Sequence, residues 1–147
     1  MLALGFMIAG TIPADAATPK QNALTYARKQ MGDRYSQVNP QGPNHWDCSG
    51  LMQAAYKSAG KSLPRVAQAQ YNATKHIALS AAQPGDLLFF GRDSKHITHV
   101  GIFTGYKNGK GYMVNANTGS YRGRKVVEAP TSEYRIGGNK EFAGVVK

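Results

Sequence analysis

Apolar residues recur at helical spacing in three stretches of the first half of the chain. The first stretch predicts a helix over residues 19–31, because a capping threonine and a first-turn proline precede it and Gly32 follows it. The second stretch begins at Asp47, and its leucine and alanines would share one face up to Gly60, a typical helix stop. A shorter third helix is predicted over residues 66–74.

The second half of the chain alternates short apolar runs with turn residues, which is typical of strands. A Pro-Gly-Asp turn signal precedes the first run, and the glycines of residues 105–111 predict a hairpin turn. Helices first and consecutive antiparallel strands afterwards predict an α+β domain with one helix packed on a small sheet. The five predicted strands cover residues 87–90, 99–104, 112–116, 125–128 and 142–146.

Residues 32–47, between the first two predicted helices, are rich in Asn, Gln, Gly and Pro. This composition predicts an ordered loop, with Tyr35 and Trp46 as aromatic anchors. Loops of this length are uncommon in compact domains unless they have a function. The loop is therefore a candidate part of a binding or catalytic site.

Length and charge narrow the classes of function. A chain of 147 residues is enough for one compact domain with its own core and too short for two ordinary domains. The 18 Lys and Arg residues outnumber the 8 Asp and Glu residues, and the formal net charge of +10 favours an anionic partner such as a bacterial envelope. The basic residues are spread along the chain without a basic tail, so no nucleic-acid partner is expected.

The N-terminal residues have the pattern of a targeting segment. Residues 2–12 are an apolar run, and an Ala-Asp-Ala cleavage motif follows shortly after. The run is shorter than the roughly 20 residues of a spanning helix, so no stable membrane insertion is expected. It lacks a leading Lys or Arg, and a buried terminal helix is the alternative. We expect residues 1–16 to be a signal peptide or apolar leader, residues 17–147 to form the single domain, and the protein to be secreted or cell-wall associated.

The one cysteine is the first candidate for chemistry. Cys48 has no partner for an intramolecular disulfide, and it lies in the first turn of a predicted helix, where the helix dipole would lower the thiol pKa. A thiol nucleophile needs a base, and His99 begins a strand. Asn115, on the next strand, could orient the imidazole. Spacing alone leaves a structural role open, because a lone Cys is often a buried residue and a strand His is often structural.

Four motifs extend this pattern in a fixed order. They are Asp47-Cys48-Ser49-Gly50-Leu51, Leu63-Pro64-Arg65 with Gln70, Gln83-Pro84-Gly85-Asp86-Leu87-Leu88-Phe89-Phe90, and His99-Val100-Gly101-Ile102-Phe103. Together they resemble the NlpC-type family of papain-like cell-wall cysteine peptidases, over about residues 19–147. The resemblance implies a papain-like cysteine peptidase fold in which N-terminal helices, one bearing the nucleophile, pack on a small antiparallel sheet. It also implies hydrolysis of peptidoglycan stem peptides, typically between γ-linked D-glutamate and the following diamino acid.

The resemblance also assigns catalytic roles to individual residues. Cys48 matches the nucleophile, His99 the general base, and Asn115 the third polar residue, a position where the family often has His. Tyr35 resembles the family's upstream tyrosine, which helps to polarise the oxyanion together with the Cys48 backbone N–H. The family's Trp-Gly-Gly turn does not follow Tyr35 here, and the only Trp stands at Trp46. The shape of the cleft and the preferred stem-peptide variant therefore stay open.

Three further residues match substrate-binding positions of the family. Asp47 and Ser49 match positions that hold the free amino end of the stem peptide, although Asp47 is equally suited to cap the helix. Arg65 matches an arginine that is either structural or meets a substrate carboxylate.

We expect neither a cofactor nor a metal. A site built from Cys48, His96 and His99 is conceivable, but the chain lacks metal-ligand signatures, and His96 is the alternative base. The expected partners are peptidoglycan stem peptides and, by charge, anionic wall polymers, and we expect a monomer. Two alternatives stay open: a non-catalytic envelope-binding module, and an amidase or acyltransferase acting on another acyl substrate. A host remodelling enzyme, a phage lysin and a toxin all fit the sequence.

Overall fold

The computed structural model describes residues 16–119 and 122–147. Nearly all of the predicted leader lies outside the described residues. Among the helices in the described part of the chain, none is both long and apolar enough to cross a membrane.

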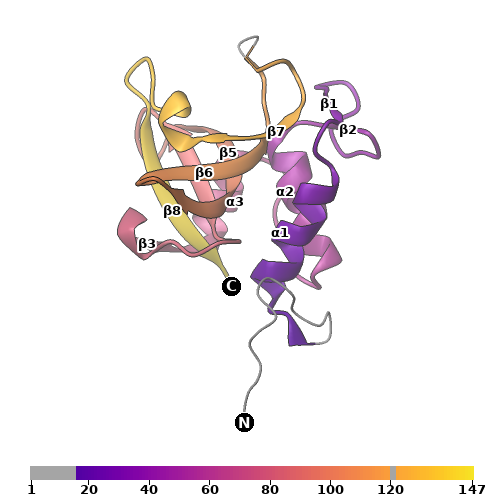
Figure 1. Cartoon of the computed structure of the whole chain (residues 1–147), viewed down its shortest axis with the longest axis horizontal. Helices are drawn as coiled ribbons and strands as arrows, with labels where there is room; N and C mark the ends of the chain where they lie inside the picture. Colours follow the sequence, from indigo (N-terminus) through magenta and orange to yellow (C-terminus); the bar gives the residue numbers. More distant parts are fainter. Residues whose placement is uncertain (1–15, 120–121) are drawn as a thin grey trace.

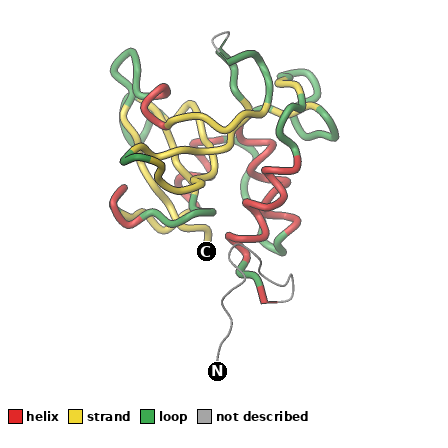
Figure 2. The backbone as a smooth tube through the Cα atoms, viewed as in Figure 1, coloured by secondary structure: helices red, strands yellow, loops and turns green. Residues whose placement is uncertain are grey.

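Helices and strands separate into two layers (Figures 1 and 2). Helices α1 (Pro19–Lys29) and α2 (Cys48–Ser58) lie side by side, and with α3 (Ala67–Ala73) they contact β5 of the sheet. The sheet is antiparallel with the order β3-β8-β4-β5-β6-β7. Its strands are β3 (Thr74–Ile77), β4 (Leu87–Gly91), β5 (Ile97–Lys107), β6 (Lys110–Ala116), β7 (Val126–Pro130) and β8 (Lys140–Val146). The predicted α+β, papain-like architecture is confirmed.

The order of strands differs from the consecutive arrangement that the sequence predicts. Strands β4 to β7 are consecutive neighbours, but β8 returns to lie between β3 and β4. Strand β3 was not predicted, because its Thr-Lys-His-Ile sequence continues directly from α3 and has no apolar alternation. It forms because β8 offers it a free edge.

The hairpin between β5 and β6 is tighter than predicted. Strand β5 continues to Lys107, and only Asn108 and Gly109 form the turn. Both have positive φ, 52° and 78°. An Asn-Gly pair with this conformation matches the right-handed twist of the flanking strands, which is why it is favoured in two-residue hairpins.

The core lies on both faces of β4. Its five residues are all buried, and successive side chains point to opposite faces. Leu87 and Phe89 pack toward the helices, whereas Leu88 and Phe90 pack into a smaller cluster on the other face. Burial on both faces explains why the sequence of β4 is a continuous apolar run and does not alternate between apolar and polar residues.

The loop between α1 and α2 is ordered around a buried tryptophan. Strands β1 (Arg34–Tyr35) and β2 (His45–Trp46) pair in parallel. Trp46 is 2% exposed, and its Nε1 donates a hydrogen bond to Asp33 Oδ2 at 2.9 Å. The predicted anchoring by Trp46 is therefore confirmed, and the loop is held against the start of α2.

Substitution of Gly50 by Ala tests how tightly this loop packs on α2. A Cβ at this position would collide with the Pro40 carbonyl oxygen. Helix propensity alone would make Gly50→Ala stabilising by about 1 kcal/mol. We expect destabilisation instead, by about 1–3 kcal/mol, because the loop must move.

Chemical denaturation of the two proteins measures this difference. Gly119→Ala is the matched control, since its Cβ would meet nothing within 4 Å; it should change the free energy of unfolding by no more than about 0.5 kcal/mol. A stabilised Gly50→Ala protein would show that the loop does not pack as described.

Candidate active site

The nucleophile candidate is the first residue of α2. Asp47 caps this helix, because its Oδ1 accepts a hydrogen bond from the Gly50 N–H at 2.6 Å. Cys48 is partly exposed, and backbone groups of Val100, Ser49 and Cys48 itself hydrogen-bond its sulfur. Val100 directly follows His99 on β5, so the packing of α2 on β5 brings the thiol to the strand that bears the candidate base.

The candidate base is oriented from the neighbouring strand. Asn115 on β6 is fully buried, and its Oδ1 lies 2.9 Å from His99 Nε2. The Asn115 Nδ2 donates to the Val127 carbonyl at 3.5 Å, which leaves Oδ1 as the acceptor. The hydrogen bond therefore assigns the proton to Nε2 of the neutral imidazole and leaves Nδ1 as the acceptor for a thiol proton.

Burial sets the resting protonation of both groups. Desolvation raises the pKa of the Cys48 thiol to about 11, and the nearby Asp47 carboxylate adds to this; the backbone hydrogen bonds oppose it only partly. This direction is opposite to the predicted lowering, because the cost of burying a thiolate exceeds what the backbone hydrogen bonds return. Burial also lowers the pKa of His99, although the bond to Asn115 opposes this. Burial therefore favours the neutral form of both the thiol and the imidazole.

A cleft of about 780 Å³ opens over this pair. Tyr35 lines it, and the Arg124 guanidinium lies 5.0 Å from the centre of the Tyr35 ring. The Tyr35 N–H also donates to the Arg124 carbonyl at 2.9 Å. The structure therefore brings Tyr35 into the same cleft as Cys48 and His99, as the sequence predicts.

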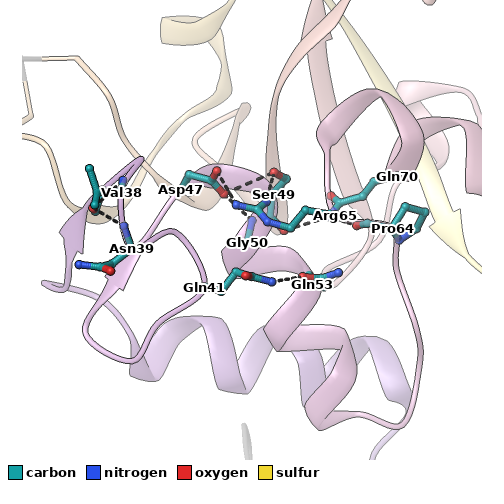
Figure 3. Close-up of polar contacts among 11 residues, drawn as sticks. Val38, Asn39, Gln41, Asp47, Ser49, Gly50, Gln53, Pro64, Arg65 and Gln70 are labelled. Carbon is teal, nitrogen blue, oxygen red and sulfur yellow. Dashed lines mark hydrogen bonds and ion pairs between the residues drawn. The ribbon is translucent and has the colours of Figure 1, made fainter.

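The three predicted substrate-binding residues bind one another (Figure 3). The Arg65 guanidinium pairs with Asp47 Oδ2 at 2.8 Å and donates to Ser49 Oγ at 2.9 Å. Ser49 is 5% exposed. Asp47 thus does cap the helix, Arg65 holds that cap, and none of the three lines the main cleft.

Gln70, a residue of α3, binds the first turn of α2. It is fully buried, and its Nε2 donates to the Ser49 carbonyl at 2.9 Å and to the Pro64 carbonyl at 2.8 Å (Figure 3). These two bonds hold the Leu-Pro-Arg segment against the first turn of α2. Gln70 therefore connects two of the sequence motifs physically.

Sequence reasoning missed several residues that line the cleft. They are Asn117, Arg122, Arg124, Glu133 and Tyr134. The first three lie in the segment between β6 and β7, and the last two lie in a short 3-10 helix, η4 (Thr131–Tyr134), that was not predicted. No local sequence pattern indicates that these positions face Cys48.

The other three histidines, His45, His76 and His96, do not line the cleft. His96 is exposed, and its Nδ1 lies 2.7 Å from Asp93 Oδ1. His76 is also exposed and lies in β3, where its ring stacks on that of Tyr71 with centroids 3.9 Å apart. Among residues 16–119 and 122–147, no group of three or more His, Cys, Asp or Glu side chains is placed to hold a metal ion.

Comparisons with known proteins agree on one family. The sequence model of the NlpC/P60 family matches residues 32–140. The chain is 39% identical to the probable endopeptidase p60 of Listeria monocytogenes over 114 residues, which are 78% of this chain and 22% of p60. It is 41% identical to the bifunctional muramidase/DL-endopeptidase CwlT of Bacillus subtilis over 99 residues, which are 66% of this chain and 29% of CwlT.

A solved structure shows the same likeness. The peptidoglycan hydrolase RipB of Mycobacterium tuberculosis superposes with a TM-score of 0.69 at 31% identity, covering 87% of this chain and 64% of that one. The chain spans less than a third of the length of p60 and of CwlT.

The raised thiol pKa predicts how Cys48 reacts with an alkylating reagent. Because the thiolate is the reactive form, the iodoacetamide rate should rise about tenfold per pH unit through neutrality and level off only near pH 11. Mass spectrometry follows the label on the one cysteine, and the unfolded protein in urea, with a thiol pKa near 8.5, is the control. A rate that stays high from pH 5 to 7 would instead reveal a resting thiolate–imidazolium pair.

Proposed function

Because the chain belongs to the NlpC/P60 family, we propose that it is a cell-wall hydrolase, a cysteine endopeptidase that cleaves peptidoglycan stem peptides. The observation that carries the proposal is the cleft in which Cys48 and His99 meet, with Asn115 orienting the imidazole. The names of p60, CwlT and RipB support the substrate class. The DL-endopeptidase activity in the name of CwlT supports the bond between γ-linked D-glutamate and the diamino acid as the one cleaved.

Acylation begins from the neutral pair. Nδ1 of His99 takes the proton of the Cys48 thiol as Sγ attacks the scissile carbonyl carbon. Substrate that fills the cleft excludes water, so the ion pair forms together with the attack rather than before it. The imidazolium then gives its proton to the leaving amine, the C–N bond breaks, and a thioester remains on Sγ. Asn115 stabilises the imidazolium through its Oδ1 during this step.

Hydrolysis of the thioester repeats the two proton transfers, with water in place of the thiol and the thiolate as the leaving group. His99 takes a proton from water, the hydroxide attacks the thioester carbonyl, and the thiolate leaves and is protonated by the imidazolium. We assign stabilisation of both tetrahedral oxyanions to the Tyr35 hydroxyl and the Cys48 backbone N–H. The proximity of the Arg124 guanidinium to the Tyr35 ring favours this assignment, because it holds that ring on the cleft wall.

Asp47, Ser49 and Arg65 are the proposed site for the free amino end of the stem peptide. The Asp47 carboxylate already pairs with Arg65 at 2.8 Å, and their side chains are 22% and 32% exposed. An ammonium group would therefore share this carboxylate with Arg65. Such binding affects the position of the peptide, but because Asp47 also caps the helix that begins with Cys48, changes here should affect kcat as well as KM.

The proposed site of action is the bacterial envelope. A leader at residues 1–16 would export residues 17–147, and detection of Met1 in secreted protein would contradict that step. The formal net charge of +10 favours residence on an anionic wall.

Muropeptides of defined sequence test the activity directly. The chain should release peptides cut after γ-D-glutamate under reducing conditions, and Cys48→Ala and His99→Ala should abolish release. Asn115→Ala should lower kcat by about a hundredfold to ten-thousandfold, the range lost when a general base is no longer oriented. Mass spectrometry identifies the bond. Cleavage elsewhere would point to another acyl substrate, and binding without cleavage by the unaltered chain would point to a non-catalytic envelope module.

The charge predicts a dependence on salt. Lysis of intact walls should weaken from about 0.01 M to about 1 M salt, over which the Debye length falls from about 30 Å to about 3 Å. Cleavage of a small soluble muropeptide by the same protein is the control and should change much less. Equal salt responses of wall and muropeptide would contradict a role for the charge in wall residence.

A further inference from the structure

The imidazole of His99 lies beside two aromatic rings, and one of them, Tyr134, belongs to none of the sequence motifs. The ring of Tyr134 stacks on it with centroids 5.1 Å apart and planes 3° from parallel. Phe90, fully buried on β4, lies 6.2 Å from the imidazole and 5.7 Å from the Tyr134 ring. These separations are those of favourable offset aromatic pairs. The stacked ring thus covers one face of the candidate base.

Tyr134 is itself held in place by its hydroxyl. The Oη donates to Asn117 Oδ1 at 2.8 Å. Asn117 is 6% exposed, and its Nδ2 donates to the Gly119 carbonyl at 2.9 Å and the Gly123 carbonyl at 2.7 Å. Every hydrogen-bonding group of the Asn117 amide is therefore engaged, and the Tyr134 ring has little freedom to tilt.

An ion pair at Glu133, the residue before Tyr134, also holds η4 in place. The Arg122 guanidinium binds the Glu133 carboxylate through two bonds, of 2.6 Å and 2.5 Å. Such a two-point pair restricts orientation as well as distance. The end of η4 is therefore attached to the segment between β6 and β7 through both Glu133 and Tyr134.

We propose that Tyr134 is a positioning residue for His99, which holds the imidazole plane so that Nδ1 faces Cys48 while Nε2 faces Asn115. The hydrogen bond to Asn115 fixes one atom of the ring but leaves rotation about that bond. A parallel ring at stacking distance blocks this rotation. It also keeps water from one face of the imidazole. The effect on turnover rests on the proposed function, whereas the effect on the imidazole does not.

The test separates the ring from the hydroxyl. Tyr134→Leu removes the stack, and Tyr134→Phe keeps the stack but loses the bond to Asn117. Tyr106→Leu is the matched control, because Tyr106 is 60% exposed and lies outside the cleft. Titration of ¹³C-labelled histidine by NMR gives the His99 pKa, with His99→Gln used to assign its signal among the four histidines. Only Tyr134 changes among the charged and titratable groups that line the cleft with His99, which are Tyr35, Cys48, Arg122, Arg124, Glu133 and Tyr134.

We expect Tyr134→Leu to raise the His99 pKa toward its ordinary value, because water reaches the imidazole and relieves the desolvation that lowers it. With muropeptide, kcat should fall by about tenfold to a hundredfold at nearly constant KM, as for misplacement of a catalytic group. Tyr134→Phe should keep the pKa and restore most of kcat, and Tyr106→Leu should match the unaltered protein in both.

An unchanged His99 pKa in a folded Tyr134→Leu protein would overturn the proposal. A change in KM alone would also overturn it and would make Tyr134 a substrate contact. If the unaltered chain cleaves no muropeptide, the proposed function fails, but the NMR titration still decides whether Tyr134 positions the imidazole.

Discussion

Burial of the apolar face of α2 against β5 is the constraint on which the site depends. Residues of α2 share one hydrophobic cluster with Val100 and Ile102 of β5. The Tyr56 hydroxyl also donates to the Gly85 carbonyl at the turn before β4. Because Cys48 is the first residue of α2 and His99 precedes Val100 on β5, this packing places the thiol and the imidazole in one cleft. The buried residues of α2 are Ser49, Gly50, Leu51, Met52, Ala55 and Tyr56.

The position of Cys48 also depends on how the first turn of α2 is held in place. Asp47, Arg65 and Gln70 do this through the cap, the ion pair and two bonds to backbone carbonyls. A helix end that enters a site without such partners would leave polar groups unsatisfied. The motif residues around Cys48 therefore have a mechanical role in this chain, whatever they contribute to substrate binding.

The burial that assembles the site also disfavours the charged forms of Cys48 and His99. Desolvation raises the pKa of Cys48 and lowers that of His99, so both groups rest neutral. Charged side chains on the cleft wall are placed where they find partners, as Arg122 does with Glu133 and Arg124 with the Tyr35 ring. In the proposed reaction the Cys48 thiol stays protonated until it attacks the scissile carbonyl, because exclusion of water by the substrate disfavours a separate thiolate still further.

The sequence by itself determined the three α-helices, five of the six strands of the main sheet and the candidate residues Cys48, His99 and Asn115. These follow from local periodicity, caps and motifs, which act over a few residues. Only the tertiary structure decided that β8 lies between β3 and β4, that Asp47 pairs with Arg65, and that Tyr134 stacks on His99. It also reversed the predicted direction of the Cys48 pKa shift. Desolvation and stacking depend on which distant segments pack together, and no local pattern contains that information.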